Sequence, residues 1–298
     1  MLSLNQFYNK LNYFKTCLIK FVLRQGNNCP SCNSDNSIIV ERKYLITSLK
    51  KCHNCQLMFR VPNTTVKENK IFYQDDYSQE FGTDCPNNEQ LKIMIKNNFI
   101  ATERDYTKYI EILKIIKDQN NNNTLDVFDF GCSWGYGSFQ LKKEFNVISY
   151  EISQPRARYA KERLNIDVLS ENQLRALENS ERKFDIFFMS HVLEHLPTPK
   201  KTLDFAMKVL KKNGYIISFT PNGSLMYKKI NKKWSKLWGQ VHPNFIDEGF
   251  YKNYFKDNNY YIGSAPYNFS NIKNFLNEKN NIIDNLSGDE LFIIAKNN

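Results

Sequence analysis

The sequence predicts an α/β fold in which a mostly parallel sheet is flanked by helices, with a small cysteine-containing module in front of it. Three observations lead to this prediction. Short apolar runs alternate with helical segments in the second half of the 298-residue chain, a glycine-rich turn follows the first run, and two C-x-x-C pairs precede it. Such alternation is typical of βαβ units, whose parallel strands are covered on both faces.

Length and composition favour a folded protein with more than one unit. A chain of 298 residues exceeds what one compact core usually needs, so we expect a main domain and an accessory one. A hydrophobic fraction of 41% is ample for a packed core. The net charge of +10 comes from scattered lysines in a chain that is also rich in Asn and Ile, which indicates AT-rich codon usage rather than a polyanion site.

The sequence also predicts a cytoplasmic location. No stretch approaches the roughly 18 to 20 apolar residues of a membrane-spanning helix. The apolar run from Cys17 to Leu23 is broken by Lys20, and no small-residue cleavage site follows it. Seven cysteines in a cytoplasmic chain are more often thiols or metal ligands than disulfides.

Residues 1–28 are expected to form one amphipathic helix. Between Leu2 and Arg24, apolar residues recur every three to four positions, and lysines occupy the opposite face. Such a helix either docks on its own protein, which we favour, or attaches to a membrane surface or partner. The apolar positions are Leu4, Phe7, Leu11, Phe14, Leu18 and Phe21, and the lysines are Lys10, Lys15 and Lys20.

Residues 29–62 contain the motifs C-P-S-C and C-H-N-C, separated by 19 residues that include a β-forming run. Two such knuckles can direct four thiolates at one tetrahedral Zn²⁺, which predicts a zinc-ribbon module. Because four thiolates fill the coordination shell, the metal is expected to be structural, and His53 is expected to be a bystander. The predicted ligands are Cys29, Cys32, Cys52 and Cys55.

Residues 63–123 are interpreted as a helical region that connects the module to the main domain and covers the substrate. Apolar residues at helical spacing predict a helix over Gln90–Lys117. An asparagine-rich run ends this region, and residues 124–298 form the main domain.

The main domain is expected to contain a series of strands with helices between them. Ligands of such sheets bind at the carboxyl ends of the strands. The predicted strands are Leu125–Phe130, Val147–Glu151, Phe184–Met189, Tyr215–Phe219 and Leu291–Ala295.

The turn after the first strand reads D-F-G-C-S-W-G-Y-G, beginning at Asp129. Small residues there let the backbone approach a cofactor closely, although a tight connection between a strand and a helix would look similar. Glu151 ends the second strand, about 20 residues later, where an acidic side chain reaches ribose hydroxyls. Both features predict a nucleoside-containing ligand, but dehydrogenases share them.

Two later segments distinguish a methyltransferase from a dehydrogenase. K-F-D-I-F-F-M-S-H-V-L-E-H-L-P-T-P and L-K-K-N-G-Y-I-I-S-F-T-P-N resemble the segments around strands four and five of class I S-adenosylmethionine-dependent methyltransferases. The resemblance extends over Leu125–Ala295. It is closest to the small-molecule and sugar methyltransferases in which a four-cysteine zinc-binding module precedes the catalytic domain. It implies a Rossmann-like, seven-stranded, mostly parallel sheet.

The resemblance also implies the cofactor site. Asp129 would lie near the methionine amino group, the glycines would line methionine and ribose, and Glu151 would hold the ribose diol. Ser133 stands where the family more often has glycine, a variation we expect to be tolerated. The expected S-adenosylmethionine contacts are Asp129, Gly131, Ser133, Gly135, Glu151, Ile152 and His191.

Three histidines, His191, His195 and His242, are candidates for the general base, since imidazole titrates near neutral pH. His191 directly follows the fourth strand at the cofactor pocket, so we expect it to contact S-adenosylmethionine instead. His195 belongs to an E-H pair that could instead support the helix start. His242 follows a segment containing Trp234, Trp238 and Tyr227, which could form an aromatic wall for a sugar acceptor. We prefer His242, against the alternative of a loop residue fixed by its neighbouring proline.

The sequence thus predicts methyl transfer to a small-molecule acceptor, foremost a sugar or glycan precursor of polysaccharide biosynthesis. An RNA methyltransferase would use the module and the positive charge to bind phosphates, but an N-P-P-Y type motif is missing after strand four. A non-catalytic Rossmann-like binding protein is the other alternative. The methylated atom and the oligomeric state stay open.

Overall fold

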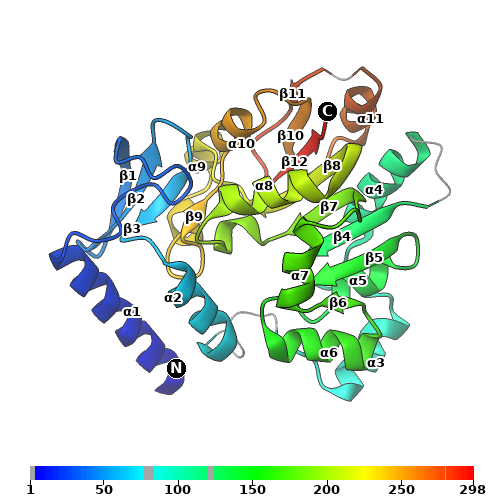
Figure 1. Cartoon of the computed structure of the whole chain (residues 1–298). Coiled ribbons are helices and arrows are strands. Elements are labelled where there is room, and N and C mark those ends of the chain that lie inside the picture. Colours follow the sequence, from blue (N-terminus) through cyan, green and yellow to red (C-terminus); the bar gives the residue numbers. More distant parts are fainter. Residues whose placement is uncertain (1–3, 77–83, 120–123, 279) are drawn as a thin grey trace.

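The computed structural model of the chain describes residues 4–76, 84–119, 124–278 and 280–298. These residues form two sheets, a large one that carries most of the helices and a small one built mainly from residues 37–61 (Figure 1).

The large sheet has the strand order β11-β10-β12-β8-β7-β4-β5-β6. Strands β6, β5, β4, β7 and β8 are parallel, whereas β12 runs antiparallel to both β8 and β10. The expected mostly parallel α/β sheet is confirmed, with the two-residue β11 as an eighth strand at its edge. The strands are β4 (Asp126–Phe130), β5 (Asn146–Tyr150), β6 (Val168–Leu169), β7 (Phe184–Ser190), β8 (Leu210–Pro221), β10 (Tyr260–Ser264), β11 (Ile282–Ile283) and β12 (Glu290–Lys296).

Helices cover both faces of this sheet because successive strand residues point to opposite faces. Phe128 and Phe187 pack with α7, α8 and α10 on one face. Val127 and Phe188 pack with α4, α5 and α11 on the other. The helices are α4 (Thr107–Gln119), α5 (Tyr136–Leu141), α6 (Gln154–Leu164), α7 (Glu171–Glu178), α8 (Pro199–Val209), α10 (Glu248–Tyr254) and α11 (Phe269–Glu278).

The single helix expected over Gln90–Lys117 is wrong. The chain forms α3 (Asn88–Lys96) and α4 instead, with a turn between them in which Asn98, Phe99 and Ala101 have φ values of 50°, 61° and 60°. This left-handed backbone ends the helix and places the Phe99 ring in the core, 6.2 Å from the ring of Trp134. The free energy gained by burying the Phe99 side chain thus exceeds that gained by continuing the helix through this segment.

The small sheet combines residues that lie far apart in the sequence. Its order is β1-β2-β3-β9, and every pairing is antiparallel. Strands β1 (Ser37–Lys43), β2 (Thr47–Cys52) and β3 (Met58–Val61) come from the cysteine-containing segment, whereas β9 (Asn244–Phe245) follows α9 (Leu225–Ile230) and the 3₁₀ turn η3 (Trp234–Leu237). A strand from the second half of the chain therefore completes the N-terminal sheet.

The N-terminal helix α1 (Leu4–Val22) lies beside α2 (Val66–Ile71) in Figure 1. Lys20 pairs with Glu68 at 2.6 Å, and Cys17 is buried. Contrary to the expectation that the apolar row packs on the protein, Leu18 is 50% exposed, and Leu11 and Phe21 are exposed as well. None of the described helices is both long and apolar enough to cross a membrane.

Candidate active site

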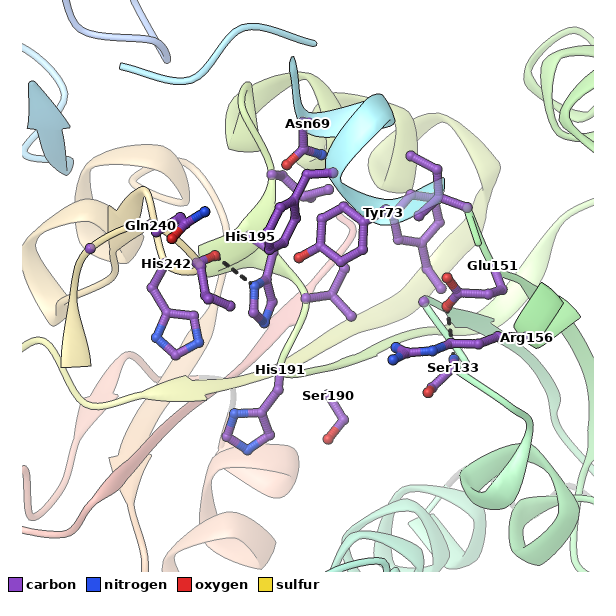
Figure 2. A pocket seen from close by; sticks show the side chains of 18 of the residues that line it. Asn69, Tyr73, Ser133, Glu151, Arg156, Ser190, His191, His195, Gln240 and His242 are labelled. Carbon is purple, nitrogen blue, oxygen red and sulfur yellow. Dashed lines mark hydrogen bonds between the residues drawn. The ribbon is translucent and has the colours of Figure 1, made fainter. Parts of the chain in front are cut away.

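A cavity of about 830 Å³ lies at the carboxyl ends of β4, β5 and β7 (Figure 2). The loop after β4 and the end of β5 line one part of it. The turn after β7, the π-helical turn η1 (Phe72–Asp76) and residues 236–242 line another. Seven of the predicted site residues border it, namely Gly131, Ser133, Glu151, Ile152, His191, His195 and His242.

The loop after β4 needs small residues for steric reasons. Gly131 has a φ of 88°, and a Cβ there would lie 2.5 Å from Cγ2 of Val192. Ser133 has a φ of 52°, in the left-handed region that favours glycine. Its buried Oγ has no hydrogen-bond partner among the described residues. The loop thus borders the cavity with small residues and contains this one unsatisfied hydroxyl, which suits close contact with a polar ligand.

Glu151 is fixed at the wall of the cavity. Its carboxylate accepts hydrogen bonds from the backbone N–H of Ser133 at 2.9 Å and of Ser153 at 2.8 Å. Burial raises the pKa of Glu151, while these N–H groups and the nearby Arg156 oppose that rise. The side chain is therefore oriented by the loop that it faces.

Asp129 and Gly135 are not among the described residues that line the cavity. The buried carboxyl of Asp129 accepts a hydrogen bond of 2.5 Å from Ser138 Oγ, and burial raises the pKa of Asp129 to about 7. A Cβ at Gly135 would lie 2.8 Å from that of Ala160. Asp129 thus contacts α5, and Gly135 packs against α6.

His191 lies between two carboxylates. Its Nε2 is 2.7 Å from Glu290 Oε1, and its Nδ1 is 3.4 Å from Glu194 Oε1. Burial alone would lower the pKa of His191, but the two carboxylates outweigh it and raise the pKa to about 10. The imidazole is thus a cation at neutral pH. Glu290 also accepts a hydrogen bond from Tyr109 at 2.6 Å.

The structure brings His195 and His242 together, with ring centroids 4.6 Å apart. His195 Nδ1 lies 2.9 Å from the carbonyl oxygen of Val241, and His242 Nδ1 lies 2.7 Å from that of Leu237. Because a carbonyl only accepts, Nδ1 of each ring carries a proton, and in the neutral form of either ring Nε2 is the acceptor. Burial lowers the pKa of His195 to about 4, so this ring is neutral.

The aromatic wall expected beside His242 is wrong in large part. Trp234 and Tyr227 are buried in a cluster with Leu49 and Met58 of the small sheet. Of the three aromatic residues, only Trp238 is among the described residues that line the cavity. These rings join the loop to the small sheet, where their apolar area is removed from water.

Sequence reasoning missed several residues of the site. Arg156 of α6 lines the cavity on the side of Glu151, and Tyr73 and Gln240 line it elsewhere (Figure 2). Arg156 could have been found as a cation in the first turn of the helix that follows Glu151. Tyr73 and Gln240 lie in segments without a motif, so only the tertiary structure places them here.

The four predicted zinc ligands also meet. The Sγ atoms of Cys29 and Cys55 are 3.4 Å apart, those of Cys32 and Cys52 are 3.5 Å apart, and all four lie within 4.8 Å of one another. None of these cysteines forms a disulfide. Zn–S bonds of about 2.3 Å set sulfur atoms roughly 3.8 Å apart in a tetrahedron. The cluster is therefore compatible with a Zn²⁺ ion.

Comparisons with known proteins found a matching family. A family profile described as "Methyltransferase domain" matches residues 101–265. The uncharacterized protein MJ1123 of Methanocaldococcus jannaschii is 30% identical over 118 residues, which cover 39% of this chain and 57% of that protein. The matched part thus spans little more than half of this relative.

Solved structures show the same fold. The plantazolicin methyltransferase BamL, in complex with a triazolic desmethylPZN analog and SAH, is similar with a TM-score of 0.53 and 15% identity, over 77% of this chain and 96% of that one. The plantazolicin methyltransferase BpumL in complex with SAH gives 0.50 and 12%, over 77% and 94%. Because the family profile covers more than half of the chain, the protein belongs to the methyltransferase domain family, and it has the class I fold of the enzymes that use S-adenosylmethionine as methyl donor.

Proposed function

We propose that this enzyme transfers the methyl group of S-adenosylmethionine to a small-molecule acceptor of the sugar or glycan-precursor class. One observation carries the proposal: a single cavity joins the Gly131 loop and Glu151 to the paired rings of His195 and His242. The first group suits a nucleoside, and the second suits an acceptor that must lose a proton.

At the cofactor end, the residues present fit the cofactor. When bound, S-adenosylmethionine supplies an electrophilic sulfonium methyl group. The oriented carboxylate of Glu151 would accept hydrogen bonds from the ribose hydroxyls. Gly131 and the unsatisfied hydroxyl of Ser133 would approach the cofactor from the loop, with Ile152 and His191 beside them.

Asp129 and Gly135 have a narrower role in this proposal. Neither is among the described residues that line the cavity, so we propose that their contacts with α5 and α6 shape the loop that does.

At the acceptor end, His242 is the proposed general base. Its Nδ1 is committed to the carbonyl of Leu237, so its Nε2 can take the proton of an acceptor hydroxyl. His195 is the weaker candidate, because a pKa of about 4 leaves its Nε2 with little basicity at neutral pH. Enclosure by η1 and residues 236–242 would limit access of water to the reacting groups.

The remaining parts of the chain are assigned by the same proposal. Residues 29–62 would form a structural zinc module, residues 63–123 a covering region, and residues 124–298 the catalytic domain. The exposed apolar row on α1, within residues 1–28, supports peripheral contact with a membrane that carries a lipid-linked acceptor.

The proposal is tested by the fate of the methyl group. Purified enzyme is incubated with S-adenosylmethionine labelled on the methyl carbon, and with either a panel of nucleotide sugars and sugar phosphates or total tRNA. We expect label in the small-molecule fraction. Label confined to tRNA, or no enzyme-dependent transfer to any of these acceptors, would refute the proposed acceptor class.

A further inference from the structure

A second cavity, of about 220 Å³, adjoins the acceptor end of the active-site cavity. It is lined by residues of α1, by the end of β3 and by α2. Four of its lining residues also line the active-site cavity, so the two cavities share a wall. These are Asn69 and Gln240, which Figure 2 labels, together with Phe72 and Val241. Since Val241 directly precedes His242, a ligand in the second cavity would lie beside the proposed acceptor site.

The second cavity contains a buried cation. The side chain of Arg60 lines it and is only 4% exposed. The guanidinium donates hydrogen bonds to the carbonyl oxygen of Pro62 at 2.6 Å, to Thr64 Oγ1 at 2.5 Å and to Cys17 Sγ at 3.5 Å. None of these partners is a carboxylate, and Nε has no hydrogen-bond partner among the described residues. Arginine is not deprotonated in proteins, and a buried charge is unfavourable unless an opposite charge compensates it, so an anion is the expected occupant.

The neighbours of Arg60 do not supply that negative charge. Lys20 and Glu68 are the other charged residues in the described lining, and they pair with each other at 2.6 Å. Tyr13 lies with its ring centre 5.2 Å from Arg60 Cζ, which favours the cation through the face of the ring. Burial raises the pKa of Tyr13, so its phenol is neutral. The described lining thus has one net positive charge, that of Arg60.

We propose that the second cavity binds a phosphate group of the acceptor through Arg60. A planar guanidinium can donate two parallel hydrogen bonds to phosphate oxygens, and the unsatisfied Nε–H is a suitable donor for one of them. The cavity has room for several water molecules, and therefore for a phosphate group.

The role of this phosphate rests on the proposed function, whereas the anion site itself does not. A phosphate held by Arg60 would fix the acceptor beside the segment that contains Val241 and His242, with its hydroxyl group directed to the general base. The acceptor would then be a phosphorylated sugar. The phosphate can belong to a soluble sugar phosphate or to a lipid-linked sugar, because the guanidinium recognises the same oxygens in both.

Binding of inorganic phosphate tests the site without any assay of methyl transfer. The full-length protein is titrated with inorganic phosphate by calorimetry at constant ionic strength. We expect saturable binding, and we expect Arg60→Met to weaken it roughly 10- to 100-fold, the effect of losing hydrogen bonds from a charged group. The control Arg163→Met, which removes an exposed arginine of α6, should bind phosphate normally.

A second pair of variants leaves Arg60 in place. Thr16 of α1 is exposed and lines the second cavity. Thr16→Glu adds a negative charge to the lining, whereas Thr16→Gln adds a side chain of nearly the same size without a charge. We expect Thr16→Glu to bind phosphate more weakly than Thr16→Gln, on the order of fivefold. If circular dichroism shows that Arg60→Met does not fold, this pair decides alone.

Other results overturn the proposal. Absence of phosphate binding in the unmodified protein, undiminished binding in folded Arg60→Met, or equal affinities in the Thr16 pair would show that the cavity holds no anion at Arg60.

The source of the phosphate is identified with two further probes, glucose 1-phosphate and a polyprenyl phosphate in phosphatidylcholine vesicles. Binding of either probe that the same variants weaken supports the proposal and names the source. If inorganic phosphate binds and neither probe does, the assignment to the acceptor is wrong. Calorimetric binding of S-adenosylmethionine, measured in parallel, shows separately whether the proposed function fails.

Discussion

The backbone N–H of Arg60 donates a hydrogen bond of 2.7 Å to the carbonyl oxygen of Pro243, the residue that follows His242. Arg60 belongs to β3 of the cysteine-containing segment, and β3 pairs directly with β9. The cysteine cluster and the proposed acceptor site are therefore mechanically linked. A metal ion bound by the cysteines would influence turnover indirectly, because it would hold in place the loop that contains His242.

This link predicts that Cys52→Ser impairs turnover. Cys52 is buried, and its loss should remove one zinc per chain, loosen the small sheet and displace His242. A displacement of about 1 Å costs roughly 10²-fold in turnover, whereas S-adenosylmethionine affinity should persist because Glu151 directly follows β5 of the large sheet. Elemental analysis, kinetics and calorimetry measure the three quantities. Cys85→Ser, outside the cluster, is the control. Full turnover of Cys52→Ser after loss of the zinc would contradict the proposed link between the cysteines and His242.

Glu151→Ala should weaken S-adenosylmethionine binding. The substitution removes the proposed ribose partner, and hydrogen bonds to a charged group are worth about 1 to 3 kcal/mol. Titration calorimetry on the variant and on the surface control Glu178→Ala measures the difference. Unchanged affinity in Glu151→Ala would show that the ribose lies elsewhere.

Gly131→Ala should abolish measurable cofactor binding. The new methyl group would lie 2.5 Å from Cγ2 of Val192, and the φ of 88° disfavours any side chain. Adding Val192→Ala removes the clash but leaves the backbone strain, so the double variant should recover part of the affinity. Calorimetry measures the affinity of both variants for S-adenosylmethionine. Normal binding by Gly131→Ala would contradict the prediction.

Asp129 should make stability depend on pH. Burial raises the pKa of its carboxyl to about 7 in the folded protein, against about 3.9 in an unfolded chain. Between these values the folded state binds more protons, so the contribution of Asp129 to stability falls as the pH rises from about 4 to 7. Asp129→Asn does not titrate. The free energy of unfolding of Asp129→Asn minus that of the unmodified protein should therefore be larger at about pH 8 than at about pH 5. Urea unfolding at the two pH values measures this difference. The same difference at both pH values would exclude the effect.

Local patterns were sufficient to predict the strands that end at Phe130 and Tyr150, the second to within one residue, because buried strands and small-residue turns are encoded within a few positions. They were also sufficient for the cysteine cluster, whose paired spacing reflects the geometry of two knuckles. The helix break at Phe99 was missed because the core contact that favours it involves Trp134, which is remote in sequence.

The acceptor end was harder to predict because it depends on long-range pairing. Nothing near His242 in the sequence indicates that β9 joins the small sheet or that the His242 ring meets His195. Likewise, Glu290 near the chain end gives no local sign that it faces His191. Trp234 was taken for an acceptor contact because an aromatic residue that packs against a second sheet has the same local pattern as one that faces a ligand.

The central claim, that acceptor chemistry occurs at His242 and cofactor binding elsewhere in the same cavity, is tested most directly by His242→Ala. Turnover with the methylated acceptor and the dissociation constant of S-adenosylmethionine are measured on the same protein. We expect turnover to fall roughly 10² to 10⁴-fold while the dissociation constant is nearly unchanged. Near-full turnover in this variant would contradict the account.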